Sequence, residues 1–263
     1  TEVGKHFEGA MNKLYAVRSS AVQEDGKQFS FAGQFETHLY VQWQDLQKFI
    51  KNIWKSNFSE RVSTYLKTNQ LSPQFGIGVV IQEMIDPDVS GVAFGINPNT
   101  GAENSKVVCS VYGVGEGLVS GELNADTFNL NGAEISASLV QKERKAVRAA
   151  SGEIEFIAVP TEQQEGASLN SEQILLIAKH LDALEKNLDG PQDIEFAIKD
   201  NIIYLLQTRP ITAIIQSNDP QSGKNRIIWD NSNIVESYPG VTTPLTFSYI
   251  KTAYESVYRQ LSL

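Results

Sequence analysis

The chain has 263 residues, of which 41% are hydrophobic and 20% are charged, with 19 glycines and 9 prolines. This composition is ordinary for globular domains and excludes collagen-like, low-complexity and fully disordered classes. The 31 acidic residues against 22 basic ones give a net charge of −9. That charge disfavours general binding to nucleic acid or anionic membranes, and leaves room for a small anion in a local basic pocket.

Cysteine content and hydropathy exclude several further classes. The single cysteine, Cys109, cannot form an internal disulfide, and no Cys/His cluster has the spacing of a zinc site. The longest nearly uncharged stretch, residues 75–85, is too short to span a bilayer, and no signal peptide is visible. We therefore expect a cytoplasmic protein with no membrane partner.

The N-terminal part begins with a short apolar run, residues 14–17, which predicts a strand that ends in a polar loop at Arg18. Residues 38–41 predict a returning strand. Between residues 45 and 66 apolar side chains recur at helical spacing, and Asp45 is a suitable N-cap. Further strands are predicted at residues 77–82, 92–96, 107–112, 127–130 and 154–159.

The C-terminal part contains a second amphipathic helix, residues 171–188. Asn170, followed three residues later by Gln173, predicts a capping box, and Gly190 with the proline after it ends the helix. Runs of strands interrupted by two long helices indicate an α+β fold with antiparallel sheets. The remaining predicted elements are strands at 194–198 and 202–206 and a linker at 216–224.

Polar side chains alternate along the hairpin formed by these last two strands. Period-two alternation puts Asp193 and Glu195 on one face of the first strand, and Gln207 and Arg209 follow the same spacing on the second. A carboxylate, an amide and a guanidinium on one face suit a magnesium-bound triphosphate. A merely solvated polar face is the alternative interpretation.

The loop length of this hairpin decides whether its polar groups share a face. A two-residue turn at residues 200–201 pairs Ile198 with Ile203 and sends Glu195 and Gln207 to opposite faces. A three-residue loop pairs Ile198 with Ile202 and places Glu195 diagonal to Gln207 on one face. We therefore predict the three-residue loop, although the Asp-Asn pair favours a two-residue turn.

Two other loops could approach a phosphate group. The glycines at 113, 115 and 117 follow a strand, as in a dinucleotide-binding loop, but Leu118 stands where a third spaced glycine is needed. A tight turn is the preferred interpretation there. Arg18 with the serines after it, and Gly33 further on, suit phosphate binding as well as they suit a polar surface loop.

Taken together, several segments resemble one family. The chain is similar to the ATP-binding domain of phosphoenolpyruvate synthase, pyruvate phosphate dikinase and the rifampicin phosphotransferases, over about residues 14 to 215. The resemblance implies an ATP-grasp fold that binds ATP and Mg²⁺. The segments that carry it are Ala16–Ala21 with Glu24 and Asp25, Ser30–Gln34, Val80–Met84 with Ser90–Phe94, Gly113–Glu116 with Val119–Gly121, and Pro191–Glu195 through Gln207–Pro210.

The resemblance also implies a role for each matching residue. Arg18 and Arg209 are the implied catalytic residues: the first contacts the nucleotide phosphates and the second stabilises the transferring phosphoryl group. Glu195 and Gln207 are the implied ligands of Mg²⁺. The other implied nucleotide contacts are Gly33 and Thr37, in a loop over the phosphates, and Gln82, Glu83 and Ile85, in a hinge at the adenine.

The same resemblance suggests how the chain is organised. Residues 1–82 are expected to form the remaining part of a small lobe, residues 83–215 a large lobe, and residues 216–263 a linker and the start of a connector. The family's N-terminal Gly-Lys segment, its phosphohistidine domain and its pyruvate-binding barrel have no counterpart here. We therefore expect an incomplete ATP-grasp fold that acts with phosphohistidine and acceptor domains of the same full-length chain.

The expected function is the nucleotide-binding part of a phosphoenolpyruvate synthase-like phosphotransferase, in which ATP phosphorylates a histidine and the histidine phosphorylates pyruvate. Alone, the chain is expected to bind Mg-ATP weakly or not at all and to be inactive. One alternative is the ATP domain of a rifampicin-type antibiotic phosphotransferase. Another is a non-catalytic, decayed ATP-grasp module, and the intact Arg18, Glu195, Gln207 and Arg209 argue against decay.

Overall fold

The computed structural model describes residues 10–21, 37–56, 58–59, 62–64, 77–98, 101–102, 105–188 and 190–211. The chain divides into two compact units, Thr1–Ser217 and Asn218–Leu263, and every described residue belongs to the first. The predicted linker and connector at 216–263 lie outside the described residues, and so does Gly33. The division into a small and a large lobe at residue 82 stays a prediction.

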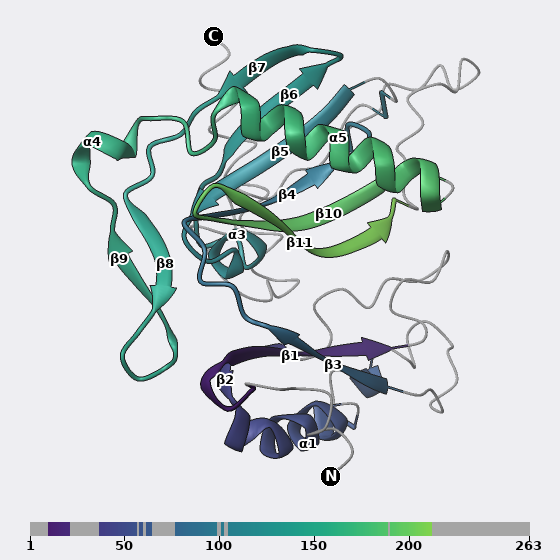
Figure 1. Ribbon diagram of the computed structural model, residues 1–263, viewed down its shortest axis with the longest axis vertical. Helices are drawn as coiled ribbons and strands as arrows, with labels where there is room; N and C mark the ends of the chain where they lie inside the picture. The colour runs from purple at the N-terminus through teal and green to yellow at the C-terminus, as the bar shows by residue number, and fades with distance from the viewer. Residues whose placement is uncertain are drawn as a thin grey trace, which may run out of the picture. The chain divides into compact units, whose positions relative to one another are not determined.

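Three strands near the N-terminus form an antiparallel sheet, the small sheet (Figure 1). Its order is β2-β1-β3, with β1 at Leu14–Ala21, β2 at Thr37–Gln42 and β3 at Ile77–Glu83. Helix α1 (Leu46–Ser56) packs against one face of this sheet and buries Tyr15, Val17 and Ile53 between them. The small sheet therefore has one apolar face under α1 and a second face that is left to other contacts.

The first predicted helix is shorter than expected. It begins after the 3₁₀ turn Trp43–Asp45, so that Asp45 directly precedes it, and α1 ends at Ser56 rather than at residue 66. Residues 62–64 are again helical. Ser56 is buried and its hydroxyl donates to the carbonyl of Ile53 at 2.7 Å. This bond gives a donor to a carbonyl of the last turn, where a helix end leaves carbonyl groups without an intrahelical partner.

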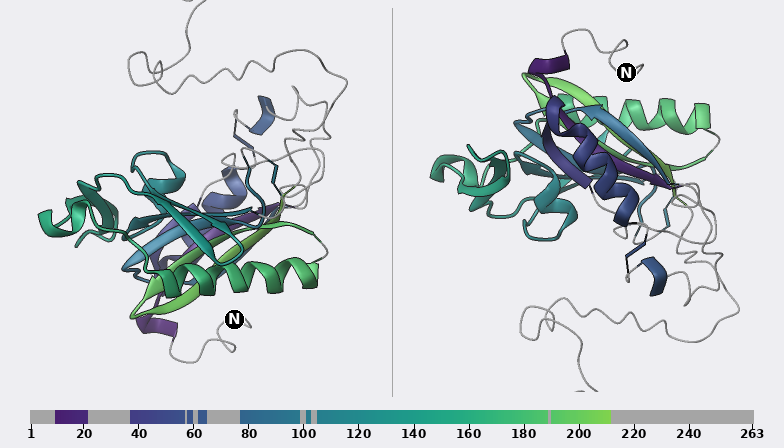
Figure 2. Two further views of the ribbon diagram at one scale, coloured as in Figure 1. Left: turned by 90° about the horizontal axis from the view of Figure 1, so that it is seen from above. Right: turned by 90° about the horizontal axis from the view of Figure 1, so that it is seen from below.

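Six strands form a second antiparallel sheet, the large sheet, in the order β11-β10-β4-β5-β6-β7. Helix α5 (Ser171–Leu188) covers one face of it, and Figures 1 and 2 show the helix running along this sheet. Ile177 and Leu181 of α5 are fully buried against Ile194 and Phe196 of β10. The strands are β4 (Val89–Phe94), β5 (Ser105–Tyr112), β6 (Asp126–Asn131), β7 (Glu134–Ser138), β10 (Gln192–Lys199) and β11 (Ile202–Pro210).

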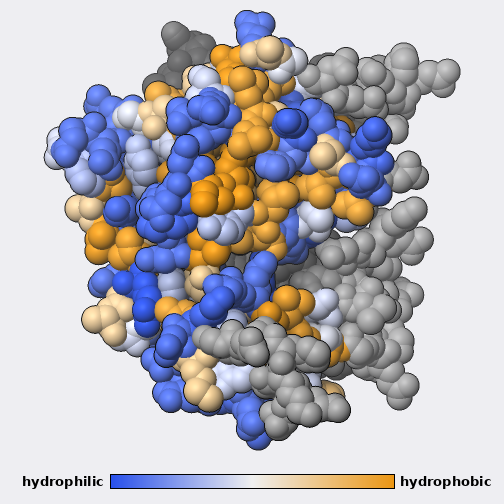
Figure 3. Space-filling view, viewed as in Figure 1, coloured by the Kyte–Doolittle hydropathy of each residue, from blue (hydrophilic) through white to orange (hydrophobic). Residues whose placement is uncertain are grey.

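Helix α5 has the bounds and the cap that its sequence predicts. The Asn170 side chain accepts from the Gln173 backbone N–H at 2.9 Å, and the Gln173 side chain accepts from the Asn170 N–H at 3.0 Å. This reciprocal pair satisfies two amide groups that the first turn of a helix leaves unbonded. Leu175 and Leu176 remain about two-fifths exposed, at 42% and 41%, and Figure 3 shows apolar surface gathered over the region of α5.

The remaining described elements are small. Strands β8 (Arg144–Arg148) and β9 (Ile154–Ala158) form a separate hairpin, and α3 (Glu116–Val119) and α4 (Thr161–Gln164) are single turns. Neither β7 nor β8 is predicted by the sequence, because both are polar strands with mostly exposed or half-buried side chains. In the part of the chain that the structure describes, no helix is long and apolar enough to cross a membrane. The elements make a mixed fold of antiparallel sheets with few helices.

Candidate functional site

The polar face of the small sheet presents three of the predicted site residues. Residues paired across antiparallel strands share a face of the sheet. Arg18 of β1 pairs with Thr37 of β2 and with Val80 of β3, and Gln82 lies two residues beyond Val80 on the same strand. Arg18, Thr37 and Gln82 therefore share the face that is turned away from α1 and its apolar core.

The hairpin of β10 and β11 differs from the predicted one in its loop. Asp200 and Asn201 form a two-residue turn with positive φ angles of 49° and 62°, and Ile198 pairs with Ile203. The predicted three-residue loop is wrong, because both turn residues tolerate the left-handed backbone conformation that such turns require. From the turn alone, Glu195 and Gln207 would point to opposite faces.

A β-bulge later in the hairpin reverses that outcome. Phe196 pairs with Leu205, whereas the next residue, Glu195, pairs with Gln207, so that Leu206 is an extra residue on β11. The bulge shifts the register by one residue and brings Gln207 onto the face of Glu195. The prediction that these two side chains share a face is confirmed, although they lie directly opposite each other rather than diagonally.

The side chains of Glu195 and Gln207 converge on Arg18 from the small sheet. One guanidinium nitrogen of Arg18, Nη2, donates to Glu195 Oε2 at 2.8 Å and to Gln207 Oε1 at 2.7 Å. The side chains of Arg18 and Glu195 are only 22% and 19% exposed, so this charge-assisted contact is stronger than one on an open surface. Residues almost two hundred positions apart thus meet at one point.

Arg209 lies on the same face, next to this cluster. It pairs with Asp193 across the ladder, two residues beyond the pair of Glu195 and Gln207. The Arg209 Nε donates to Asp193 Oδ1 at 3.1 Å, with the two side chains 31% and 21% exposed. Asp193 therefore orients the guanidinium of Arg209, a role that follows from the bulge and that the sequence alone does not indicate.

The donor set of this cluster fits a magnesium ion that also binds phosphate. A single atom, Arg18 Nη2, already lies within hydrogen-bonding distance of a carboxylate oxygen and an amide oxygen, so one cation can be reached by both. Among the described residues, no group of three or more His, Cys, Asp or Glu side chains is placed to hold a metal. Mg²⁺ characteristically takes one or two protein oxygens and completes its shell with phosphate and water.

Apart from Gln82, the structure does not bring the other described nucleotide contacts that were predicted into this cluster. Thr37 is exposed at the start of β2. Glu83 lies on the opposite face of β3 from Gln82, and its carboxylate forms an ion pair with Lys13 at 2.7 Å. Ile85 is half-buried in the segment that follows β3. Among the hinge residues, Gln82 directs its side chain to the large sheet, where its Nε2 donates to the Leu206 carbonyl at 3.0 Å.

The glycine-rich loop after β5 has a structural reason for its first glycine. Gly113 has a φ of +76°, and a Cβ atom there would lie 2.1 Å from the Ala146 carbonyl oxygen. The loop leads into α3 and forms a close approach to β8 rather than a helix that opens with a phosphate-binding turn. The tight-turn interpretation is therefore the better one for this loop.

We expect Gly113→Ala to destabilise the fold more than Gly121→Ala does. Gly121 has a similar φ of +77°, so both variants share a left-handed strain of about 1–2 kcal/mol. A Cβ atom at Gly121, however, would have no described atom within 4 Å. Overlap with Ala146 should add about 1–3 kcal/mol at Gly113 alone. Urea unfolding of the two variants measures the difference, and equal stabilities would contradict the close approach.

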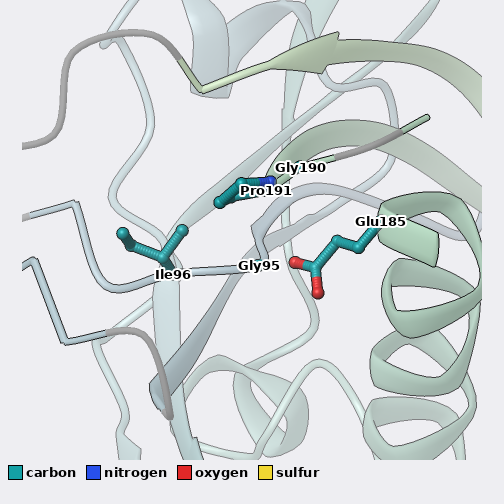
Figure 4. A pocket seen from close by; sticks show the side chains of 5 residues that line it. All are labelled: Gly95, Ile96, Glu185, Gly190 and Pro191. Atoms are coloured by element: carbon teal, nitrogen blue, oxygen red, sulfur yellow. The ribbon is translucent and has the colours of Figure 1, made fainter.

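A shallow pocket elsewhere on the large sheet is not part of this cluster. Gly95, Ile96, Glu185, Gly190 and Pro191 line it, and Figure 4 shows the Glu185 carboxylate directed toward Gly95. Glu185 belongs to α5, which packs on the face opposite Glu195. Burial raises the pKa of Glu185 above its ordinary value, and the nearby Lys106 charge partly offsets that rise. Its Oε1 finds no hydrogen-bond partner among the described residues.

The family model of the pyruvate phosphate dikinase AMP/ATP-binding domain matches residues 1–227 of the chain. The chain belongs to this family. It is 35% identical over 247 residues to the prodigiosin synthesizing transferase PigC of Serratia marcescens and 35% identical over 216 residues to a rifampicin phosphotransferase of Bacillus cereus. It is 30% identical over 218 residues to a probable phosphoenolpyruvate synthase of Methanocaldococcus jannaschii.

These alignments cover most of the chain but a small part of each relative. They include 89%, 81% and 81% of this chain, in the same order, and 28%, 25% and 18% of the relatives. The family recognised from the sequence motifs is thereby confirmed. Each of these three relatives shares the matched region with this chain.

Proposed function

We propose that this chain supplies the Mg-ATP site of a phosphoenolpyruvate synthase-like phosphotransferase. The observation that carries the proposal is the convergence of Glu195 Oε2 and Gln207 Oε1 on Arg18, at 2.8 and 2.7 Å. An acidic oxygen, a neutral oxygen and a guanidinium at one point can bind a metal cation and polyanionic phosphates together. Membership of an AMP/ATP-binding family supports the same assignment.

In the proposed reaction the side chains position and neutralise charge. Bound Mg²⁺ supplies charge neutralisation on the phosphate oxygens, with Glu195 and Gln207 as its protein ligands. Arg18 shares its guanidinium between these ligands and the phosphates. Arg209, held by Asp193 on the same face, stabilises the phosphoryl group as it leaves the nucleotide. Phosphoryl transfer needs little covalent chemistry from the protein, so the proposed part of these side chains is positioning and charge neutralisation.

The phosphoryl acceptor is proposed to lie on other domains of the same full-length chain. In this proposal a histidine on one domain takes the phosphoryl group and passes it to pyruvate on another. The relatives carry names with different products or acceptors, yet they share this region. The common region therefore provides the nucleotide chemistry, and the remainder of each protein determines the acceptor.

A second candidate is the ATP-binding part of a rifampicin-type antibiotic phosphotransferase. It is favoured by the 35% identity with the Bacillus cereus protein, against 30% for the phosphoenolpyruvate synthase. Both candidates use the same site, and they differ in the acceptor. A decayed, non-catalytic module is disfavoured because Arg18, Glu195 and Gln207 remain in hydrogen-bonding contact.

Labelling of the full-length protein tests the proposal. Separate incubations with ATP radiolabelled at its β phosphate and at its γ phosphate should give protein-bound label in at least one case, with ADP or AMP released. The label should be stable in alkali and lost in acid, as expected for phosphohistidine. Addition of pyruvate should discharge the label, whereas rifampicin should discharge it if the second candidate is correct. The Glu195→Gln variant should retain little label. Absence of label in the wild-type protein would contradict both candidates.

A further inference from the structure

The bulge at Leu206 determines what lies in the candidate site. Without it, the ladder that starts from the turn would pair Glu195 with Leu206 and would carry Gln207 to the face of Ile194. Ile194 is fully buried in the core under α5. The bulge instead places Gln207 opposite Glu195 and Arg209 opposite Asp193. One extra residue therefore decides whether Gln207 lies on the face of Glu195 or on the apolar face of Ile194.

An extra residue in a β-bulge has no partner directly opposite it in the ladder. Its backbone groups then need other partners, since buried carbonyl and amide groups are rarely left unbonded. The Leu206 carbonyl accepts a hydrogen bond from Gln82 Nε2 at 3.0 Å in a part-buried position. Arg18, which lies on the same face of the small sheet as Gln82, bonds the side chain of the next residue, Gln207.

We propose that Gln82 is a positioning residue, whose amide N–H holds the bulge at Leu206 and thereby keeps Gln207 beside Glu195. Gln82 then acts on the metal ligands through the backbone of β11, in addition to any contact it makes with a nucleotide. The inference rests on the proposed function only for the assignment of Glu195 and Gln207 as metal ligands. The link between Gln82 and the bulge is a property of the protein without nucleotide.

Hydrogen exchange of the nucleotide-free protein tests the link directly. Gln82→Met preserves the length of the side chain but removes the donor, and loss of one neutral hydrogen bond changes a local opening equilibrium by up to about tenfold. Amide exchange at residues 205–208 should therefore rise by roughly fivefold to tenfold. The control is Gln44→Met, which removes an exposed glutamine whose Nε2 donates to Gln42 Oε1, and it should leave this exchange unchanged.

Nucleotide binding by the full-length protein separates positioning from direct contact. If Gln82 acts through Gln207, Gln82→Met should weaken Mg-ATP binding by about tenfold more than it weakens metal-free ATP binding. Direct contact with the adenine alone would weaken both equally. Unchanged exchange at 205–208, or equal weakening of the two forms of ATP, would overturn the proposal.

A deletion provides an independent check. Removing Leu206 leaves a regular ladder in which Phe196 still pairs with Leu205 and Glu195 still pairs with Gln207, with no bulge to hold. In this background Gln82→Met should weaken the binding of Mg-ATP and of metal-free ATP equally, to within about twofold. A difference between the two as large as in the wild-type background would count against the proposal. Failure of the wild-type protein to bind Mg-ATP would contradict the proposed function, and the exchange result would still decide the role of Gln82.

Discussion

Under the proposed function, replacement of Arg209 by alanine should lower the turnover number of the full-length protein by about 100-fold or more. Arg209 lies on the face of Glu195 and Gln207, and Asp193 holds its Nε at 3.1 Å. A guanidinium aimed at a transferring phosphoryl group interacts most strongly in the transition state. Nucleotide affinity should therefore change much less than turnover, and steady-state kinetics with separate binding measurements can distinguish the two.

Two further variants sharpen this prediction. Asp193→Asn leaves Arg209 in place but weakens its orientation, so turnover should fall by less than in Arg209→Ala. Arg144→Ala removes an arginine whose guanidinium stacks on Phe156 in the β8–β9 hairpin, and should leave turnover nearly normal. A near-normal turnover number in Arg209→Ala would assign Arg209 a structural role.

Removal of the buried charge at Asp126 should destabilise the fold by about 3–5 kcal/mol, because it leaves the Lys142 ammonium without its charge partner. The two side chains form an ion pair at 2.7 Å and are 0% and 2% exposed. Asp126 also accepts from the backbone N–H groups of Val140 and Ser168. Urea unfolding of Asp126→Asn measures the loss. The control Asp182→Asn, at an ion pair whose aspartate is 64% exposed, should lose less than about 1 kcal/mol.

The same pair predicts a dependence of stability on pH. Burial by itself raises the pKa of Asp126, but hydrogen bonds from Lys142, Val140 and Ser168 outweigh it and hold the pKa below its usual range. Because the folded pKa lies below the unfolded value of about 3.9, the contribution of Asp126 is complete above that pH. It is lost as the pH falls through the folded pKa. The stability difference between wild type and Asp126→Asn should shrink below about pH 4, and a constant difference would contradict this account.

Local patterns predicted the elements whose causes are local. Helix α5 has the predicted bounds because its apolar spacing and its Asn170–Gln173 cap act within one segment. Polar strands such as β7 and β8 carry no alternation strong enough to detect, since their side chains are mostly exposed or half-buried. The Asp126–Lys142 pair was missed as well, because its burial depends on the packing of the whole sheet.

The hairpin of β10 and β11 shows where a strand register predicted from the loop length fails. The shared face of Glu195 and Gln207 was predicted correctly from a wrong loop, because a bulge at Leu206 compensates for the two-residue turn. The partners of that bulge region come from far away in the sequence, with Gln82 124 residues before Leu206 and Arg18 189 residues before Gln207. No pattern within the hairpin contains this information.

A crystal structure of the full-length protein with Mg²⁺ and a non-hydrolysable ATP analogue would test the central claim most directly. We expect Glu195 Oε2 and Gln207 Oε1 to lie about 2.0–2.1 Å from one Mg²⁺ ion that also binds phosphate oxygens. Arg18 should then donate to a phosphate, and Arg209 should face the β or γ phosphoryl group. A nucleotide bound away from the β10–β11 face, or a metal that neither Glu195 nor Gln207 contacts, would contradict the account.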